Sequence, residues 1–396
     1  MRKRPSVVPA YRPDIYTTDA IVDPYPHYAR LRELGPVVWL SKHRVYALPR
    51  FAECKAVLRD DATFVSGHGV ALNPIANRLS RGTTLNSDGA EHDQRRKLLA
   101  HRMLPRALRA ISDSVDEQAV HVVEAALGRG EVDGVADLAS ALPLAVVPNF
   151  VGWPRDQRGD LLAWGGATFD VLGPLNGHWV KALPSSVQML RFARRVVRRR
   201  SVIEGSLGHD VLVAADNGKL PHRECPPLMV DYVAPSLDTT ISAISNALHL
   251  FAAFPEQWEI LKGNYELLPN AVNEVVRYES PLRAFSRKAA CDTQIGGTGI
   301  AAGSRVLVIY ASANRDEHEW DQPDSFDIRR DATRQLGFGH GSHACAGQGL
   351  ARMETQAMLR ALVERVDRIE LTAPPTWAIN NIIRRHERLP LKLIAA

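Results

Sequence analysis

The segment Gly337–Gly347, "GFGHGSHACAG", combines one cysteine, two histidines and four glycines in eleven residues. Three kinds of site could use such a loop: a phosphate-binding turn, a zinc site built from His340, His343 and Cys345, or a loop that presents one thiolate to a large flat cofactor. The phosphate-binding turn is the weakest, because G-x-G-x-G matches neither common glycine-rich fingerprint and no strand leads directly into it. Zinc usually takes four protein ligands, or three and a water, and three ligands on a glycine-rich loop make a poor cage.

The residues around Cys345 favour the thiolate. The following segment, "AGQGLARMETQAMLRALVERV", has helical periodicity, so Cys345 lies at a helix N-terminus, where backbone N–H groups and the helix dipole stabilise an anion. Gly339 and Gly341 allow the backbone reversals that lay the loop against a planar ring, and Gly347 permits close approach beyond the sulfur.

Two further side chains complete this loop: Phe338 can shield it from water, and His343 offers a nitrogen donor to a carboxylate at the edge of the ring. In full, "FGHGSHACAG" resembles the haem-binding loop of the cytochrome P450 family, F-x-x-G-x-H-x-C-x-G. The resemblance implies heme b (iron protoporphyrin IX) as the cofactor and Cys345 as the axial metal ligand, with a thiolate that pushes electron density to the iron. It also implies cofactor contacts from the other signature residues, Phe338, Gly341, His343 and Gly347.

Other segments resemble the same family in the expected order along the chain. "NAVNEVVRYESPLRAFSR" contains E-x-x-R as Glu274 and Arg277, which share one helical face and in the family form a buried structural pair joined by a later arginine. The two haem propionates need cationic donors, and the resemblance implies His92, Arg96, Arg287 and His343. The matches run from "DPYPHYARLRELGPV" to "ERLPLKL", almost the whole chain.

The segment Pro227–Phe254 reads as one helix of about 40 Å, long enough to cross the molecule. It resembles the central helix of the family, in which Asp238 and Thr239 would be the catalytic acid–alcohol pair that holds oxygen and water and relays protons from solvent. Pro235 and Ser236 depart from the usual pattern. A proline inside a helix frees one carbonyl, so we expect Pro235 to open the helix locally between Asp231 and Thr239.

Composition sets the class of protein. The chain has 396 residues, 45% apolar and 23% charged, and its helical periodicity is interrupted by strand patterns near both ends, which predicts a mainly α fold with a minor β part in one domain, 1–396. Four distant cysteines exclude a disulfide framework and an iron–sulfur cluster, and the net charge of +5 is too modest for nucleic acid. We expect a cytoplasmic, monomeric protein without a membrane segment.

The expected enzyme is a haem-thiolate monooxygenase, with the P450 fold in which the long helix covers a haem that lies against the cysteine loop. Ring-coupling or peroxygenase chemistry and a haem-binding sensor without turnover are the alternatives. No flavin or nicotinamide fingerprint occurs, so electrons would come from a ferredoxin or flavodoxin with its NAD(P)H-dependent reductase. These partners are acidic, and a basic surface would attract them, formed by Arg95, Lys97, Arg102, Arg334 and Arg352.

By position in the family, the pocket would draw on the segment Phe64–Glu91 and on residues Leu72, Phe169, Leu172, Ala234, Leu282, Phe285 and His386. These residues are mostly apolar, so the expected substrate is small and hydrophobic, aromatic rings included. The region resembles bacterial members of the family that hydroxylate or O-demethylate small aromatics, which implies the same reactions here. Relatives that take aromatic acids bind the carboxylate with hydroxyl or basic groups, whereas this chain has Val230 and Asp231 in that region. An acid there favours a neutral phenol or ether over a carboxylate.

Overall fold

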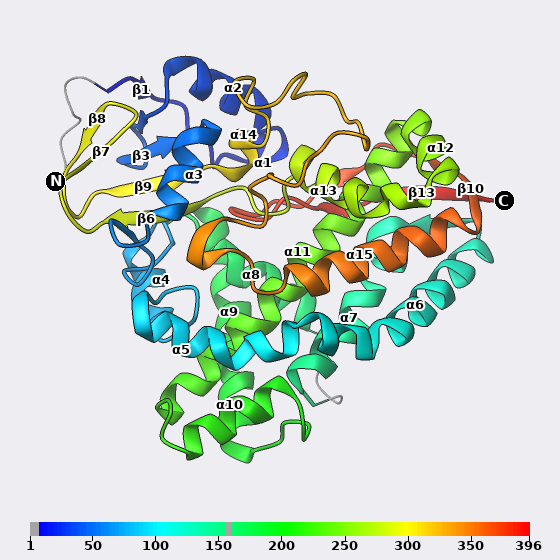
Figure 1. Ribbon diagram of the computed structural model, residues 1–396, viewed down its shortest axis with the longest axis horizontal. Helices are drawn as coiled ribbons and strands as arrows, with labels where there is room; N and C mark the ends of the chain where they lie inside the picture. The colour runs from blue at the N-terminus through cyan, green and yellow to red at the C-terminus, as the bar shows by residue number, and fades with distance from the viewer. Residues whose placement is uncertain (1–7, 155–159) are drawn as a thin grey trace.

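The computed structural model describes residues 8–154 and 160–396, and helices form most of it (Figure 1). The strands of the largest sheet lie toward the left end in Figure 1, β10 and β13 lie toward the right end, and helices form the lower half. The α-helices are α1 Thr18–Val22, α2 Tyr25–Leu34, α3 Phe51–Arg59, α4 Pro74–Leu79, α5 Gly89–Ala100, α6 Pro105–Leu127, α7 Ala141–Val151, α8 Leu161–Asp170, α9 Gly177–Arg199, α10 Leu207–Asp216, α11 Cys225–Ala253, α12 Pro255–Gly263, α13 Leu268–Tyr278, α14 Tyr310–Ala313 and α15 Gln348–Val363. The prediction of a mainly α fold with a minor β part is confirmed.

The largest sheet joins distant parts of the chain. Its six strands lie in the order β1 (Ala10–Tyr11), β2 (Val38–Leu40), β3 (Val45–Leu48), β9 (Arg305–Val308), β6 (Phe285–Ala289) and β4 (Phe64–Val65). β3 and β9 pair in parallel, so a strand from the first fifty residues is fixed beside one from beyond residue 300. β9 in turn pairs with β6, which carries Arg287 and lies between β9 and β4.

Smaller sheets complete the β part. β10 (Val366–Leu371), β13 (Pro390–Ala395) and β5 (Glu131–Asp133) form a three-stranded sheet, and two hairpins are made by β7 (Thr293–Ile295) with β8 (Thr298–Ile300) and by β11 (Thr376–Trp377) with β12 (His386–Arg388). The strand patterns expected near both ends of the chain are present as β2 and β3 at one end and as β9 and β13 at the other, and each contains β-branched or aromatic residues.

Helix α11 crosses the centre of the molecule (Figure 1). It packs against α7, α8, α9, α13 and α15, which explains why its sequence is apolar around most of its circumference. The opening expected at Pro235 is not present, because the helix continues without interruption from Cys225 to Ala253. The hydroxyls of Ser236 and Thr239 donate to the carbonyls of Tyr232 and Pro235, at 2.7 and 2.5 Å, and the helices packed around α11 hold it together.

The segment that follows β4 is more ordered than its composition predicts. It contains the short helix α4, capped by the Asn73 side chain, which accepts from the Ala76 N–H, and it leads into α5. One helical stretch, Gly134–Val151, is long and apolar enough to cross a membrane, but 56% of it is buried inside the protein. Burial in the core accounts for that composition.

Glu274 and Arg277 form the buried pair that the E-x-x-R spacing predicted. Both side chains are 0% exposed, and Arg277 donates from Nε and Nη2 to the two carboxylate oxygens at 2.7 and 2.8 Å. Arg277 also donates to the carbonyls of Asn314, Pro323 and Ser325. The pair therefore ties helix α13 to the irregular segment that leads to the Cys345 loop.

Candidate functional site

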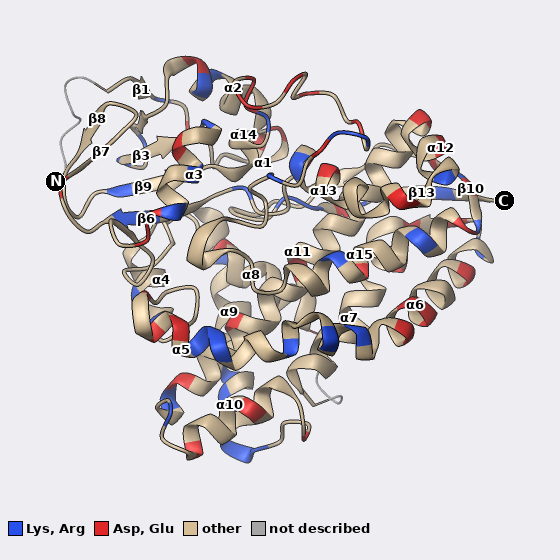
Figure 2. Cartoon of the chain, viewed as in Figure 1, with Lys and Arg blue, Asp and Glu red and all other residues tan. Residues whose placement is uncertain are grey.

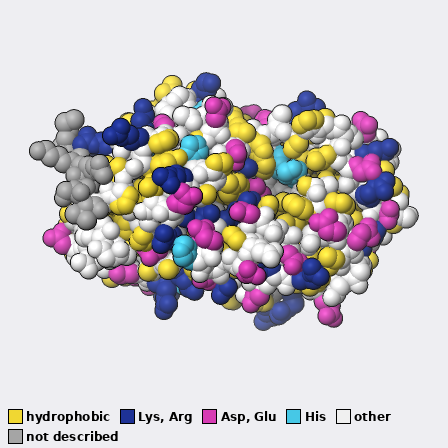
Figure 3. Space-filling view, turned by 90° about the horizontal axis from the view of Figure 1, so that it is seen from above, with side chains coloured by type: hydrophobic (Ala, Val, Ile, Leu, Met, Phe, Trp, Pro, Cys, Tyr) yellow, Lys and Arg dark blue, Asp and Glu magenta, His cyan; other side chains and the backbone are white. Residues whose placement is uncertain are grey.

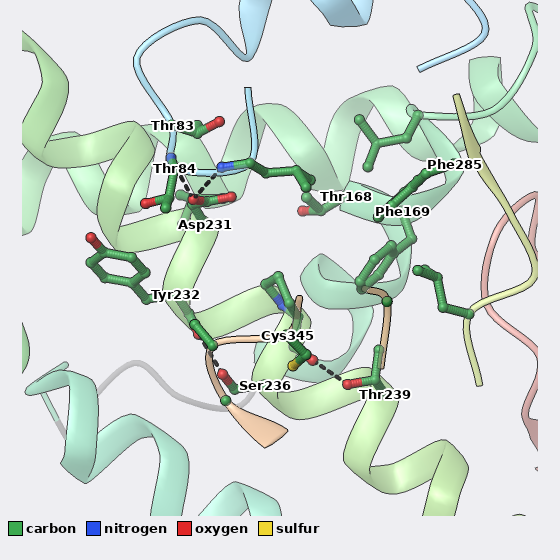
Figure 4. A pocket seen from close by; sticks show the side chains of 18 of the residues that line it. Thr83, Thr84, Thr168, Phe169, Asp231, Tyr232, Ser236, Thr239, Phe285 and Cys345 are labelled. Atoms are coloured by element: carbon green, nitrogen blue, oxygen red, sulfur yellow. Dashed lines mark hydrogen bonds between the residues drawn. The ribbon is translucent and has the colours of Figure 1, made fainter. Parts of the chain in front are cut away.

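A cavity of about 420 Å³ lies between α11 and the Cys345 loop (Figure 4). Its walls come from α4 and the turn that follows, from α5, α8, α9 and α11, and from the loop before α15. Cys345 lines one wall, and Thr239 of α11 lines another. The fold thus brings the predicted ligand and the predicted catalytic alcohol to the same space.

The Cys345 loop has the geometry that its glycines predicted. Gly339 and Gly341 adopt φ of +70° and +73°, the left-handed region that favours glycine. The Cys345 N–H donates to the Phe338 carbonyl at 2.7 Å, which closes the turn and brings the thiol close to the start of α15. Gly341 does not line the cavity; it packs behind the loop on the end of α3, where an added Cβ would clash with the Leu58 carbonyl.

Opposing influences act on the Cys345 thiol. Burial raises its pKa above the usual value, while the backbone N–H groups of Gly347 and Gln348 and the guanidinium groups of Arg96 and Arg352 lower it. The protein therefore supplies anion-stabilising dipoles and charges, and on its own they do not outweigh the cost of burying a thiolate.

Gly347 shows whether a flat group fits against this loop. It lines the cavity, and an added Cβ would meet no protein atom within 4 Å, so the surrounding protein does not require a glycine here. A planar ring lying over the sulfur would require it, because a side chain would hold the ring away. Phe338 lines the same wall, with the Arg352 guanidinium 4.7 Å from its ring centre.

The four predicted propionate ligands also line this cavity. His92 and Arg96 come from α5, Arg287 from β6 and His343 from the loop, and the His92 and His343 rings lie 4.3 Å apart. His92 is 2% exposed, and its Nε2 has no hydrogen-bond partner in the described structure. Burial, together with Arg287, His92 and Arg96, lowers the pKa of His343 to about 3.

Few protein carboxylates balance this group of cationic and donor side chains. The Asp88 carboxylate lies 3.8 Å from His343 Nε2, and His92 Nδ1 contacts the exposed Asp93 at 3.2 Å. An unpartnered buried donor beside two arginines is a suitable site for carboxylates brought by a bound group. The residues present therefore fit a haem with its propionates at this rim.

The predicted acid and alcohol lie on different faces of α11. Residues four apart share a face of a helix, and Asp231, Pro235 and Thr239 line the cavity in this way. Asp238 is rotated by about 100° from Thr239 and does not line the cavity. It is 0% exposed and packs against α8, where an added Cβ on Gly166 would lie 3.6 Å from its Oδ2.

Asp238 pairs with an arginine that the sequence did not single out. Arg385 Nε lies 2.9 Å from Asp238 Oδ1, and Arg385 also approaches the exposed Glu387 at 3.6 Å. Burial raises the pKa of Asp238, and Arg385 acts in the opposite direction. Neither oxygen of Asp238 accepts a hydrogen bond of good geometry in the described structure, so this carboxylate has room to take up a proton.

The predicted substrate residues divide into two groups. Phe169, Leu172, Leu282 and Phe285 line the cavity. Leu72, Ala234 and His386 do not, and these three placements correct the sequence prediction. Leu72 donates its N–H to the Leu172 carbonyl and packs on the core behind the wall, and Ala234 shares the α8-facing side of α11 with Asp238.

His386 belongs to a buried aromatic cluster instead. Its ring stacks on Trp377 at 3.9 Å and meets His249 of α11 at 4.7 Å. Burial, with His249, Arg384 and Arg385, lowers the pKa of His386 to about 2, so the ring is neutral. The adjacent Arg385 is the residue of this segment that contacts Asp238.

The sequence also matches known proteins. The cytochrome P450 family model matches residues 194–376. Cytochrome p450 CYP199A2 of Rhodopseudomonas palustris is 34% identical over the full length of both chains. The chain belongs to the cytochrome P450 family.

Other cytochromes P450 agree in sequence and in structure. The monooxygenase PikC of Streptomyces venezuelae is 30% identical, with 94% of this chain and 92% of that protein covered. The solved structure of cytochrome P450 CREJ in complex with (4-ethylphenyl) dihydrogen phosphate superposes with a TM-score of 0.86, at 26% identity, over 94% of this chain and 98% of that chain.

Membership of the family establishes the cofactor and the class of reaction. Cytochromes P450 bind heme b through a cysteine thiolate, and this chain is a cytochrome P450 monooxygenase. The zinc alternative finds no support: in residues 8–154 and 160–396, the only three side chains close enough to share a metal ion are Asp316, Glu317 and His318.

Proposed function

We propose that Cys345 is the axial ligand of heme b in this P450 and that the enzyme hydroxylates or O-demethylates a small hydrophobic substrate. The observation that carries the proposal is the shared cavity: Cys345 and Gly347 form one wall, the unpartnered His92 Nε2 and two arginines lie at the rim, and Thr239 faces the same space. When bound, the haem would supply the oxygen-activating chemistry of a monooxygenase.

Two residues of α11, Asp238 and Thr239, would transfer protons to the cavity. Thr239 Oγ1 donates a hydrogen bond to the Pro235 carbonyl at 2.5 Å, which orients the hydroxyl group. Its lone pairs can then accept a hydrogen bond from a donor in the cavity. Asp238 would carry protons toward Thr239 from the protein surface. Arg385 links Asp238 to Glu387, whose side chain is 62% exposed, and so marks the route to solvent.

The apolar lining supports a hydrophobic substrate. Phe169, Leu172, Leu282 and Phe285 provide aromatic and aliphatic surface, and Leu79, Leu183 and Leu190 extend it. The related CREJ structure holds a small substituted phenyl ring. The carboxylate of Asp231 in the wall disfavours an aromatic acid, so equal affinity for a benzoate and its neutral amide would contradict this part of the proposal.

We also propose a ferredoxin or flavodoxin, with an NAD(P)H-dependent reductase, as the electron source. Arg95 must be removed from the predicted docking surface, because it is 4% exposed and donates to Glu91 and Glu224 at 2.6 and 2.8 Å. Lys55 and Arg59 of α3 act electrostatically on His340 of the cysteine loop and are better candidates.

The distribution of charge elsewhere on the described surface indicates a docking site less clearly. On the face shown in Figure 3, basic and acidic side chains are interspersed, whereas Figure 2 marks basic residues along α5. A charge reversal at Arg59 should raise the KM for the electron carrier, whereas the same change at the exposed Arg198 of α9 should not. Equal effects of R59E and R198E would contradict docking beside the cysteine loop. For the same class of enzyme we propose a cytoplasmic location.

Oxygen incorporation tests the reaction. The purified enzyme, supplied with a ferredoxin, its reductase, NAD(P)H and ¹⁸O₂, should place one ¹⁸O atom in a hydroxylated product, whereas O-demethylation should give an unlabelled phenol and release one formaldehyde. A sensor gives no product, and ring coupling gives product with neither ¹⁸O nor formaldehyde. Label taken only from added hydrogen peroxide would indicate a peroxygenase.

A further inference from the structure

Asp231 is the only carboxylate among the cavity-lining residues of the described chain. It projects from α11 beside Thr83 and Thr84, in a part of the cavity away from Cys345 (Figure 4). A carboxylate is costly to bury even beside the hydroxyl groups of Thr83 and Thr84, unless other groups compensate its charge.

Two backbone hydrogen bonds hold the carboxylate in place. Asp231 Oδ2 accepts from the Thr84 N–H at 2.8 Å and from the Leu85 N–H at 3.4 Å, in the segment between α4 and α5. Oδ1 receives neither bond and remains for a group in the cavity. Burial raises the pKa of Asp231 to about 6 and these N–H groups oppose it, so the carboxylate is ionised at neutral pH.

Among the residues that the structure describes, none forms an ion pair with Asp231. Arg95 of α5 is the cation that most influences Asp231, but its guanidinium is bound to Glu91 and Glu224. The arginines that line the cavity, Arg96 and Arg287, act on His343 at the rim next to Cys345. A fixed negative charge therefore faces the cavity without a counter-charge.

The spacing along α11 sets the length of a matching molecule. Thr239 follows Asp231 by eight residues, which is about 12 Å along the helix axis. Pro235, Phe169 and Leu172 give the wall between the two positions apolar surface, and Ser236 and Thr168 add hydroxyl groups to it. A ligand with a charged group at Asp231 would therefore place an apolar carbon roughly 10 Å away, close to Cys345 and Thr239.

We propose that Asp231 determines specificity by pairing with a cationic nitrogen of the substrate, and that the oxidised carbon lies about two turns of α11 away from that nitrogen. The proposal rests on the monooxygenase function proposed above and narrows its substrate from small hydrophobic molecules to amphipathic amines. The substrate is elongated, with one ammonium end and one aromatic or aliphatic end.

Matched ligands test the charge directly. The probe is trimethyl(4-phenylbutyl)ammonium, which cannot ligate iron through its nitrogen, and the reference is its uncharged carbon isostere. Titration calorimetry and the Soret shift of the haem-loaded enzyme give the two affinities. The ammonium should bind at least about 30-fold more tightly than the isostere in the wild type.

Two variants separate charge recognition from loop anchoring. Asp231→Asn keeps an oxygen that can accept the Thr84 and Leu85 N–H groups, so the ratio of the two affinities should fall to nearly one while the isostere still binds. Asp170→Asn is the matched control: burial also raises the pKa of Asp170 to about 6, but this residue does not line the cavity, and its removal should leave the ratio unchanged.

Two results would overturn the proposal: equal binding of both ligands by the wild type, or an equal loss of both affinities in D231N, which would make Asp231 only an anchor for the loop. The carbon monoxide spectrum of the same reduced preparation tests the haem-thiolate enzyme separately. A thiolate spectrum with no discrimination between the ligands rejects the role of Asp231 alone.

Discussion

Replacing Arg277 by methionine should destabilise the protein by about 3–5 kcal/mol, because the buried Glu274 carboxylate loses its bidentate partner and keeps only the more distant Arg330 as a cation. Arg277 donates five hydrogen bonds, two to Glu274 and three to backbone carbonyls, and its side chain is 0% exposed. In R277M, Glu274 keeps only the Asp327 N–H at 3.1 Å and Arg330 at 3.4 Å. Three carbonyls also lose their donor.

The assay is urea unfolding followed by circular dichroism, with haem loss recorded in parallel. The matched control is Arg30→Met, because Arg30 and Glu33 form an ion pair at 2.6 Å with the same spacing, but their side chains are 59% and 58% exposed. Removing that pair should cost at most about 1 kcal/mol.

A fall of 3–5 kcal/mol is a large part of the stability of a typical domain, so R277M also calls for a milder companion. Arg277→Lys keeps the charge and loses the planar fork, and its stability should lie between those of the wild type and R277M. If the free energies of unfolding of R277M and R30M differ by less than about 1 kcal/mol, burial does not determine how much the Glu274–Arg277 ion pair contributes to stability.

Three further predictions concern the site and its surroundings. Gly347→Ala should fold normally but bind haem weakly, since its added Cβ meets no protein atom, whereas Gly341→Ala should lower the stability of the fold even without haem, since its added Cβ clashes with Leu58. Haem titration and thermal unfolding distinguish the two variants, and equal haem affinity in G347A and the wild type would contradict the argument that a flat ring lies over Gly347. Arg385→Met should lower product formed per electron pair by roughly 10- to 100-fold, with little further loss when combined with Asp238→Asn; additive losses would show that Arg385 does not act through Asp238. Burial raises the pKa of Glu354 from 4.5 to about 8, so the folded state holds a proton that the unfolded state releases, and the free energy of unfolding should fall by about 1.4 kcal/mol per pH unit as the pH rises from about 4.5 to about 8. Glu354→Gln should remove that pH dependence, and an unchanged pH dependence in this variant would contradict the assignment to Glu354.

Local signals in the sequence predicted the elements of the site well. The turn geometry of the Cys345 loop followed from Gly339 and Gly341, since only glycine adopts positive φ at little cost. The spacing of Glu274 and Arg277 predicted an ion pair, and the resemblance to a known family added its burial. The convergence of His92, Arg96 and Arg287 could be anticipated from that resemblance alone, because these residues come from distant segments.

Other features depend on contacts between elements, which periodicity does not encode. Ala234 and Asp238 turn toward α8, and nothing local distinguishes that face of α11 from the face that lines the cavity. The same is true at the C-terminal hairpin, where Arg385 reaches Asp238 and His386 packs on Trp377. The continuity of α11 through Pro235 likewise reflects packing by its neighbours, which outweighs the local propensity.

The spectrum of the reduced, carbon monoxide-bound protein tests the central claim most directly. Loaded with protoporphyrin iron, the wild type should show the strongly red-shifted Soret band of thiolate ligation, and Cys345→Ser should lose that band while retaining its fold by circular dichroism. If C345S keeps the red-shifted band, or the wild type binds haem without it, the iron is not held by the Cys345 thiolate and the assignment fails.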